Sequence, residues 1–337
     1  MILPKPSLHY IIALLVLCFY SCKENTNTNL ISPKNEQPQA ITALNEQIKN
    51  DPNNADLYHK RAIYYNTHTD VDAALMDMKR ALMLDSTKVN YYLTIADIYF
   101  KTNKTRNAKE SLEKCITIDA KNIPALLKLA ELFLYVKQHQ QAINYINKVL
   151  KIDGYNAKAY FMKGMSYKEI GDTTNAISSM VTAVEQDQTY YAAYIQLGIL
   201  YAEQKNPLAL DYYSNALKLK PNSIEALYNV AKFYQDIAAY SKALEAYNIL
   251  LRVNKKYKYA YFNKGVIYLI GFQKYKMAID CFDAAIKQDS LYTEPNYGIG
   301  VCYQEMGNLK QAKAYYLKAL KINNRYTPAI DALNMLQ

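Results

Sequence analysis

Histidine and cysteine are the side chains that most often bind metals or serve as nucleophiles and proton carriers, and they are scarce here. The 337 residues include four histidines and five cysteines. His59, His68 and His139 have no cysteine or carboxylate beside them at metal-site spacing. The sequence also lacks a glycine-rich phosphate loop and a nucleophile-elbow motif, and its serines and carboxylates form no convergent set. We therefore predict no catalytic residue, no metal, no cofactor and no enzymatic activity.

One cysteine stands at the end of a different kind of segment, "MILPKPSLHYIIALLVLCFYSC". Its apolar run, residues 10–20, is shorter than the roughly 20 residues that a membrane-spanning helix needs. A short positive region, an apolar region and a small residue before the cleavage point are typical of a secretory signal. We expect residues 1–21 to form this signal and residues 22–37, which are polar, to form a flexible tether.

The small residue followed by Cys22 resembles the end of a bacterial lipoprotein signal. The resemblance implies that Cys22 carries the lipid and becomes the mature N-terminus. Phe19 and Tyr20 replace the usual leucine and small residue, a looser form similar to that of Bacteroidota-type lipoproteins. Lys23 is similar to a signal for outer-membrane sorting. The expected location is therefore that of an exported outer-membrane lipoprotein, periplasm-facing or surface-exposed, with an ordinary cleaved signal or an uncleaved anchor as the alternative.

The charge balance is basic, with a formal net charge of +10. A basic protein can have nucleic acid, an anionic membrane or an anionic polymer as its neighbour. Residues 252–265 interleave four lysines with tyrosines, but helical spacing spreads these lysines over several faces, as on an ordinary solvated surface. Export would separate the chain from cytoplasmic nucleic acid, so we expect no nucleic-acid partner.

Gly164 lies in the middle of an amphipathic helical pattern, where glycine costs about 1 kcal/mol relative to alanine. Small residues recur along the chain at the same place in the pattern, at intervals of 33 to 35 residues, and an aromatic residue follows each of them three positions later. Small residues allow two antiparallel helices to approach closely. The predicted helix-packing positions are Ala62, Ala96, Ala130, Gly164, Gly198, Ala231, Gly265 and Gly300.

The pattern in residues 157–190, with Tyr160, Gly164, Tyr167 and Ala176, resembles the tetratricopeptide repeat, a helix–turn–helix of 34 residues. This resemblance implies an all-α fold: a right-handed α-solenoid superhelix of about eight units with capping helices at both ends. The capping helices are expected at residues 38–54 and 327–337. The eight units are expected at residues 55–88, 89–122, 123–156, 157–190, 191–223, 224–257, 258–292 and 293–326.

Two of these units depart from the usual length. The fifth lacks one residue at "AEQKNP", and the seventh has one additional residue at "LIGFQKYK". We expect both changes to fall in the turn between the two helices, where changes of length are tolerated best.

In this family the first helices line a concave surface on which partners usually bind. Apolar residues recur on the side of the first helices that would line this concave surface. Two interpretations of them stay open: they form a groove for an amphipathic helix or an extended apolar peptide, or they are buried by packing between the helices. The family's arrangement of lysine, asparagine and arginine that clamps the carboxylate of chaperone peptides does not appear. The predicted groove residues are Phe161, Met162, Met165, Ile195, Ile199, Tyr228, Phe262, Val266 and Tyr297.

Cysteine usage leaves one question open. Cys115 occupies a position near the end of its unit that is a small apolar residue in most of the units, and it is expected in the core. Cys281 and Cys302 lie in adjacent units, so a disulfide is conceivable in an oxidising compartment, although helical geometry seldom brings two such β-carbons within bonding range.

The function expected from these patterns is that of a lipid-anchored scaffold or adaptor in the cell envelope. Its expected partners are envelope proteins or peptides held in the concave groove, and its contact with the membrane is the N-terminal lipid. The alternative is binding of an anionic envelope glycan or lipid by basic, tyrosine-rich surfaces.

Overall fold

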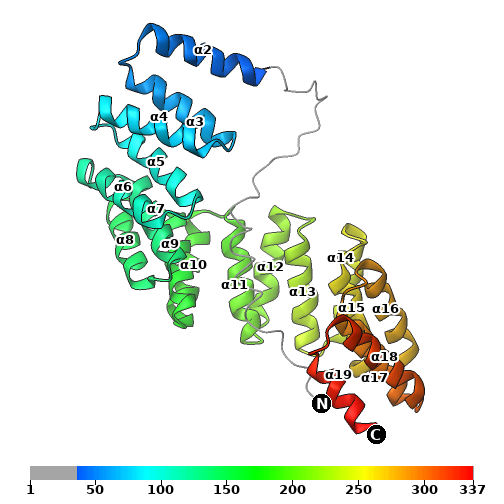
Figure 1. The fold of residues 1–337 in the computed structure, drawn as a ribbon. Helices are drawn as coiled ribbons and strands as arrows, with labels where there is room; N and C mark the ends of the chain where they lie inside the picture. The colour runs from blue at the N-terminus through cyan, green and yellow to red at the C-terminus, as the bar shows by residue number, and fades with distance from the viewer. Residues whose placement is uncertain (1–35, 337) are drawn as a thin grey trace. The chain divides into compact units, whose positions relative to one another are not determined.

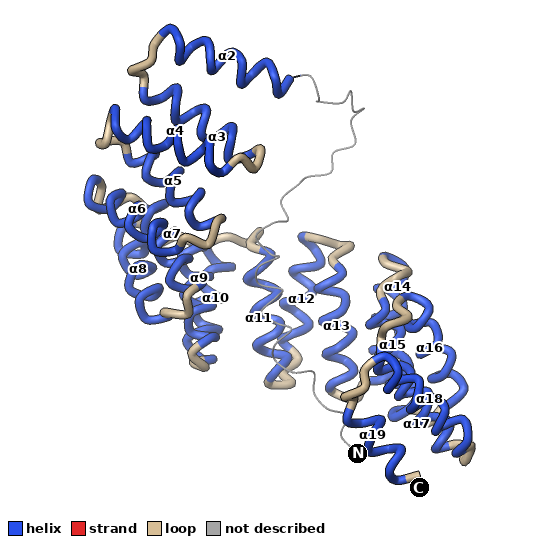
Figure 2. Tube along the Cα trace, in the orientation of Figure 1, coloured by secondary structure: helices blue, strands red, loops and turns tan. Residues whose placement is uncertain are grey.

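The computed structural model describes residues 36–336, and these are helical with short connecting turns (Figure 2). They contain eighteen α-helices, one π-helical turn and no strand. The predicted signal, the predicted lipid attachment site Cys22 and nearly all of the predicted tether lie outside the described residues. Contacts divide the chain into two compact units, the residues up to Ile98 and the residues from Tyr99 onward.

The first unit contains a helix packed on a helical hairpin, and α5 runs across its boundary. Arg61 joins three of these helices: its Nε and Nη2 donate to the Asp77 carboxylate at 2.7 Å each, and its Nη1 donates to Asn45 Oδ1 at 2.8 Å. The ion pair with Asp77 joins the two helices of the hairpin, and the hydrogen bond to Asn45 connects the N-terminal helix to them. The elements are α2 (Glu36–Asn50), α3 (Ala55–Thr67), α4 (Val71–Leu84) and α5 (Val89–Lys101).

In the second unit each helix from α6 to α19 packs on the next one (Figure 1). The elements are α6 (Thr105–Ile118), α7 (Ile123–Tyr135), α8 (His139–Ile152), α9 (Ala157–Glu169), α10 (Thr173–Gln186), α11 (Tyr191–Glu203), α12 (Leu208–Leu219), α13 (Ile224–Asp236), α14 (Tyr240–Val253), α15 (Lys258–Val266), η1 (Ile267–Gly271), α16 (Tyr275–Gln288), α17 (Thr293–Glu305), α18 (Leu309–Ile322) and α19 (Thr327–Met335).

The predicted fold class, an all-α array of tandem helix–turn–helix units, is confirmed for the described residues. Each of the eight expected units holds two helices, and its first helix begins at the first residue expected for the unit. Before the array, α2 begins two residues earlier and ends four residues earlier than the expected capping helix. After it, α19 begins at the expected residue.

Polar side chains at the turns cap the first turn of several helices. Asn156 caps α9 by accepting from the backbone N–H of Ala159 at 2.9 Å, and Ser223 caps α13 in the same way. Such caps satisfy backbone donors that have no partner inside the helix. Seven turns between repeats carry an aspartate or asparagine that accepts a backbone N–H two residues later, which favours a tight turn. These residues are Asp85, Asp119, Asp153, Asp187, Asn254, Asp289 and Asn323.

The small residues of the first helices are all buried, as their proposed role in helix packing requires. A β-carbon on Gly164 would lie 2.6 Å from Cγ of Met180 and 3.0 Å from the carbonyl oxygen of Ala176, both on the second helix of the same repeat. At Gly198 the ring of Tyr213 fills the corresponding space. A large side chain from the partner helix therefore occupies the volume that the glycine leaves empty.

In the seventh repeat the prediction that the length change falls in the turn was wrong, because the change lies at the end of the first helix. In the fifth repeat the change lies where the turn meets α12. In the seventh repeat, the π-helical turn η1 absorbs the additional residue, and the three-residue turn after it keeps the common length. A π-helical turn takes one extra residue while helical pairing continues on both sides. In the fifth repeat the turn is longer than usual and α12 is shorter, with Pro207 immediately before its first residue.

The turns inside the repeats share one backbone conformation that was not predicted from the sequence. In each of them one residue adopts a positive φ, between 54° and 82°. Glycine adopts this conformation without strain, whereas other residues pay for the crowding of their β-carbon, by about 1 kcal/mol or more. The residues are Thr69, Asn103, Lys137, Gly171, Lys205, Ala238, Gln273 and Gly307.

Candidate functional site

The first helices of the repeats carry the face on which the sequence places a binding groove. In the second unit, contacts join α7 to α9, α11 to α13, and α15 to α17. We call the side chains at the fifth, ninth and twelfth positions of these first helices, together with the polar side chains Lys158 and Gln196 that contact them, the first-helix face. The members at those three positions are Leu127, Glu131, Leu134, Phe161, Met165, Lys168, Ile195, Ile199, Ala202, Tyr228, Lys232, Gln235, Phe262, Val266, Leu269, Tyr297, Val301 and Gln304.

None of the nine predicted groove residues is fully exposed. Met162, Met165, Ile195 and Val266 are buried, with 2% to 8% of their surface accessible. Met165 packs with Met180 of the second helix, and Ile195 packs with Tyr213. These four side chains therefore belong to the buried core of the array. The remaining five are half-buried: Phe161, Ile199, Tyr228, Phe262 and Tyr297.

Four of the five half-buried residues are aromatic, and each contacts the tyrosine that ends its own repeat. The ring centroids of Phe161 and Tyr190 are 5.1 Å apart, and those of Phe262 and Tyr292 are 5.3 Å apart. Tyr228 pairs with Tyr257, and Tyr297 with Tyr326, in the same manner.

The terminal tyrosines also stand at helix boundaries. Tyr190 immediately precedes α11, and Tyr292 immediately precedes α17, so each ring pair joins one repeat to the first helix of the next. Burial raises the pKa of Tyr190 to about 12, so its hydroxyl stays protonated at neutral pH. The sequence shows these tyrosines at a regular interval, but the groove prediction did not include them.

Polar contacts also connect successive first helices along this face. Lys158 on α9 lies 4.0 Å from Glu131 on α7, and Lys168 Nζ donates to Gln196 Oε1 on α11 at 2.7 Å. Farther along, Asn263 on α15 donates to the hydroxyl of Tyr228 on α13 at 3.3 Å. The face is therefore a mixed row of rings, amides and charges.

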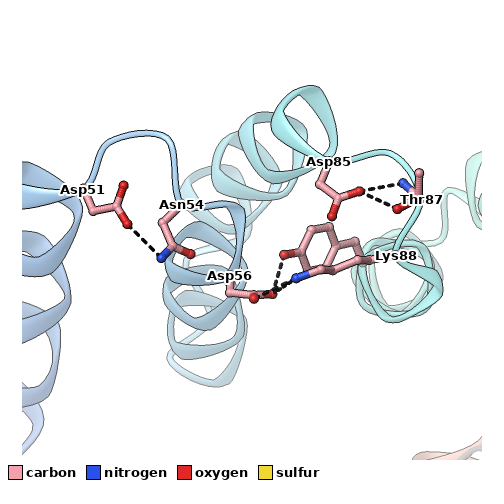
Figure 3. Close-up of polar contacts among 7 residues, drawn as sticks. Asp51, Asn54, Asp56, Asp85, Thr87 and Lys88 are labelled. Atoms are coloured by element: carbon pink, nitrogen blue, oxygen red, sulfur yellow. Dashed lines mark hydrogen bonds and ion pairs between the residues drawn. The ribbon is translucent and has the colours of Figure 1, made fainter.

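In the first unit, the corresponding helices α3 and α5 are joined by a charged cluster (Figure 3). Asp56 accepts from Lys88 Nζ at 2.7 Å and from the hydroxyl of Tyr91 at 2.5 Å. The hydrogen bond from Lys88 lowers the pKa of Asp56. His59 shares a 2.8 Å hydrogen bond with Thr94, and its ring lies 4.8 Å from that of Tyr91.

The remaining candidate chemistry is inert in this fold. Cys115 and Cys302 are buried, Cys281 is half-buried, and all three are free thiols, so Cys281 and Cys302 do not pair. Burial raises the pKa of Cys302 to about 12, which keeps it as the unreactive thiol. Within residues 36–336 no three histidine, cysteine or carboxylate side chains gather as a metal site would require. No helix in this part of the chain is both long and apolar enough to span a bilayer.

Family models agree with the repeat pattern. One model of the tetratricopeptide repeat matches residues 89–122, 123–156, 157–190 and 259–290, and a second with the same description matches residues 296–332. The matched ranges together cover about half of the chain. The first three have the same bounds as the repeats expected from the sequence.

Individual proteins show the same likeness at low identity. The solved C-terminal part of a tetratricopeptide-repeat protein from Cytophaga hutchinsonii is 20% identical, covers 72% of this chain and 99% of that chain, and has a TM-score of 0.61. Hsp70-Hsp90 organizing protein 3 of Arabidopsis thaliana is 26% identical over 106 residues, 32% of this chain and 19% of the relative. The probable glycosyltransferase SPINDLY of Hordeum vulgare, which acts on peptides with UDP-N-acetylglucosamine according to its name, is 28% identical over 152 residues, 43% of this chain and 16% of the relative. This chain spans only 9% to 19% of the length of the curated relatives it matches, so their full activities belong to those proteins.

The environment of His59 predicts a pH-dependent stability of the first unit. Burial lowers the pKa of His59 below its ordinary value of 6.5, with opposing effects from the charges of Asp56 and Lys88. The unfolded chain therefore binds the proton more readily, and the free energy of unfolding should fall as the pH drops below about 6.5. His59→Gln should reduce this fall, as measured by the urea midpoint of unfolding at pH 7.5 and pH 5. His68→Gln, at an exposed histidine, is the matched control. An identical pH dependence in wild type and His59→Gln would contradict this account.

Proposed function

Because the chain belongs to the tetratricopeptide-repeat family, we propose that it is a protein-interaction scaffold that binds peptides or protein segments on its first-helix face. The observation that carries the proposal is the row of half-buried rings and polar groups that runs from one first helix to the next in the second unit. Rings such as Phe161 and Tyr228 offer apolar area, while Gln196 and Lys158 offer hydrogen bonds and charge. Protein interfaces commonly combine such aromatic and polar contacts.

The comparisons support a binding role of this general kind. One relative is named as an organizing protein for Hsp70 and Hsp90, which describes the assembly of other proteins. The family's arrangement of lysine, asparagine and arginine that clamps a carboxylate does not appear among the first-helix positions in the sequence, so we do not propose chaperone C-terminal peptides as partners. We propose instead that the partners are proteins or peptides of the cell envelope, and that the chain itself is not an enzyme.

The proposed location rests on the N-terminal sequence. Ser21 and Cys22 follow an apolar run and precede a polar segment, as at the end of a lipoprotein signal. We propose that a lipid on Cys22 anchors the chain to the outer membrane, with the repeats in the periplasm or at the cell surface. The polar segment would then act as a tether that separates the repeats from the membrane.

A second candidate function is binding of an anionic envelope glycan or lipid. Lys255 and Lys256 are exposed in the turn before α15, and the ring of Tyr259 is exposed in the first turn of α15, whereas Lys258 is already paired with Asp289. Salt separates the two functions, because binding to a polyanion weakens steeply as ionic strength rises. Contacts made by rings and apolar side chains respond much less.

A photocrosslinking experiment tests the scaffold proposal. A benzoylphenylalanine in place of exposed Lys158, on the first helix α9, should capture a small and reproducible set of envelope proteins in intact cells. The same residue in place of exposed Ser178, on the second helix α10, is the matched control and should not capture them. Mass spectrometry identifies the products. Equal capture at the two positions, or none at Lys158, would argue against a partner on the first-helix face.

The lipid anchor has a separate test. Cys22→Ser removes the only thiol to which the lipid could be attached at the predicted cleavage point, so the variant should accumulate as an unprocessed precursor. Metabolic labelling with a fatty acid and fractionation of membranes measure the two effects. Cys18→Ser is the control and should be processed like wild type. Normal labelling and membrane association of Cys22→Ser would refute the lipoprotein prediction.

A further inference from the structure

Lys168 is unusual among the lysines of the first-helix face because its charge has no counter-ion. It lies in the last turn of α9 and is half-buried, and its Nζ donates to the neutral side-chain oxygen of Gln196 at 2.7 Å. Among the described residues, no carboxylate lies within ion-pair distance of it. Three other lysines of these first helices have such partners, Glu131 for Lys158, Asp236 for Lys232 and Asp289 for Lys258, whereas Lys264 on α15 also donates to a neutral oxygen, that of Asn248, at 2.7 Å.

The surroundings make this arrangement unfavourable for the free protein. Burial lowers the pKa of Lys168, and although the charges of Glu203 and Glu169 oppose this effect, both carboxylates are exposed and remain outside pairing distance. A half-buried ammonium loses much of its hydration, and one neutral amide replaces only part of it. Met165 stands one helical turn before Lys168, and Ile199 stands one turn after Gln196, so the pair lies between two apolar positions of the face.

The geometry also leaves donors available on both residues. Gln196 accepts from Lys168 through its oxygen, so the two hydrogens on its Nε2 still point to possible acceptors, and the ammonium has further hydrogens of its own. Two neighbouring donor groups, one of them charged, match the two oxygens of a carboxylate. First helices lie on both sides of this pair along the array, α7 before and α13 after, so a partner chain can continue past it in either direction (Figure 1).

We infer that Lys168 and Gln196 form an anion-recognising subsite of the first-helix face. The subsite would select a partner segment in which one aspartate or glutamate side chain is flanked by apolar residues. The carboxylate would supply the missing counter-ion, and the apolar neighbours would contact the half-buried side chains Phe161 and Ile199. This inference rests on the proposed function, since it names the chemistry of the partner that the scaffold binds.

A library of random dodecapeptides displayed on phage supplies the probe. Peptides selected on the immobilised full-length protein are synthesised with a fluorescent label, and each acidic residue is replaced in turn by its amide. We expect the selected peptides to contain one acidic residue whose replacement weakens binding about tenfold or more, as measured by fluorescence anisotropy. Lys168→Met should abolish the difference between acid and amide. Lys232→Met, at a lysine already paired with Asp236, should preserve it.

The possible outcomes separate this inference from the proposed function. If peptides bind but acid and amide forms bind equally, or if Lys168→Met preserves the preference, the inference fails while the scaffold proposal stands. A preference for phosphoserine over glutamate at the same position would also overturn it. If no peptide binds the wild-type protein specifically, both the scaffold proposal and the inference fail.

Thermal unfolding gives a readout that needs no ligand. Lys168→Met removes a half-buried charge without a counter-ion, so the melting temperature should rise. Lys232→Met removes a paired charge and should not raise it. A melting temperature lowered by Lys168→Met would show that Lys168 stabilises the array, and would contradict its assignment to partner recognition.

Discussion

The structure depends on one repeated contact, in which a side-chain-poor position of a first helix receives a large side chain from the second helix of the same repeat. Gly164 receives Met180, Gly198 receives Tyr213, and Gly300 receives Tyr316. Each large residue is fully or almost fully buried. Interiors are packed tightly enough that one additional methyl group at such a contact forces either the facing side chain or the helix to move. This contact sets the separation of the two helices in each repeat.

The spacing of the helices in turn determines which residues remain available for binding. Because the hairpins close tightly, apolar side chains such as Met165 and Ile195 are drawn into the core. What remains at the first-helix face is a row of aromatic rings braced by the terminal tyrosines, with amides and lysines between them. A scaffold built in this way recognises partners through ring faces and a few polar groups. Single polar residues such as Lys168 therefore contribute strongly to specificity. The repeated contact determines the spacing of the helices, and the side chains that vary between repeats determine what the face can bind.

The sequence predicted the frame well because the frame is periodic. The ladder of small residues located the repeats, and the polar residues at the turns marked the starts of the helices, as the caps formed by Asn156 and Ser223 show. The π-helical turn at Ile267–Gly271 was not predicted, because an additional residue in a helix changes the length of the repeat in the same way as one in a turn.

The exposure of the apolar residues on the first helices was not predictable either. A small rotation of the helix about its axis decides whether Phe161 or Met165 faces solvent, and the periodic pattern of apolar residues does not specify that rotation. The lack of a counter-ion for Lys168 depends on side chains from two repeats, so the sequence of one repeat does not reveal it.

A double-mutant cycle at Gly198 and Tyr213 tests the central contact most directly. Alanine normally stabilises a helix relative to glycine by about 1 kcal/mol, yet Gly198→Ala should lower the free energy of unfolding by about 1–3 kcal/mol because the ring of Tyr213 occupies the space. In the Tyr213→Leu background the same change should be neutral or stabilising. Gly154→Ala, at a turn glycine whose nearest neighbour would lie at 3.8 Å, is the control and should cost little. Equal effects of Gly198→Ala in both backgrounds, or stabilisation of the wild type, would contradict the account.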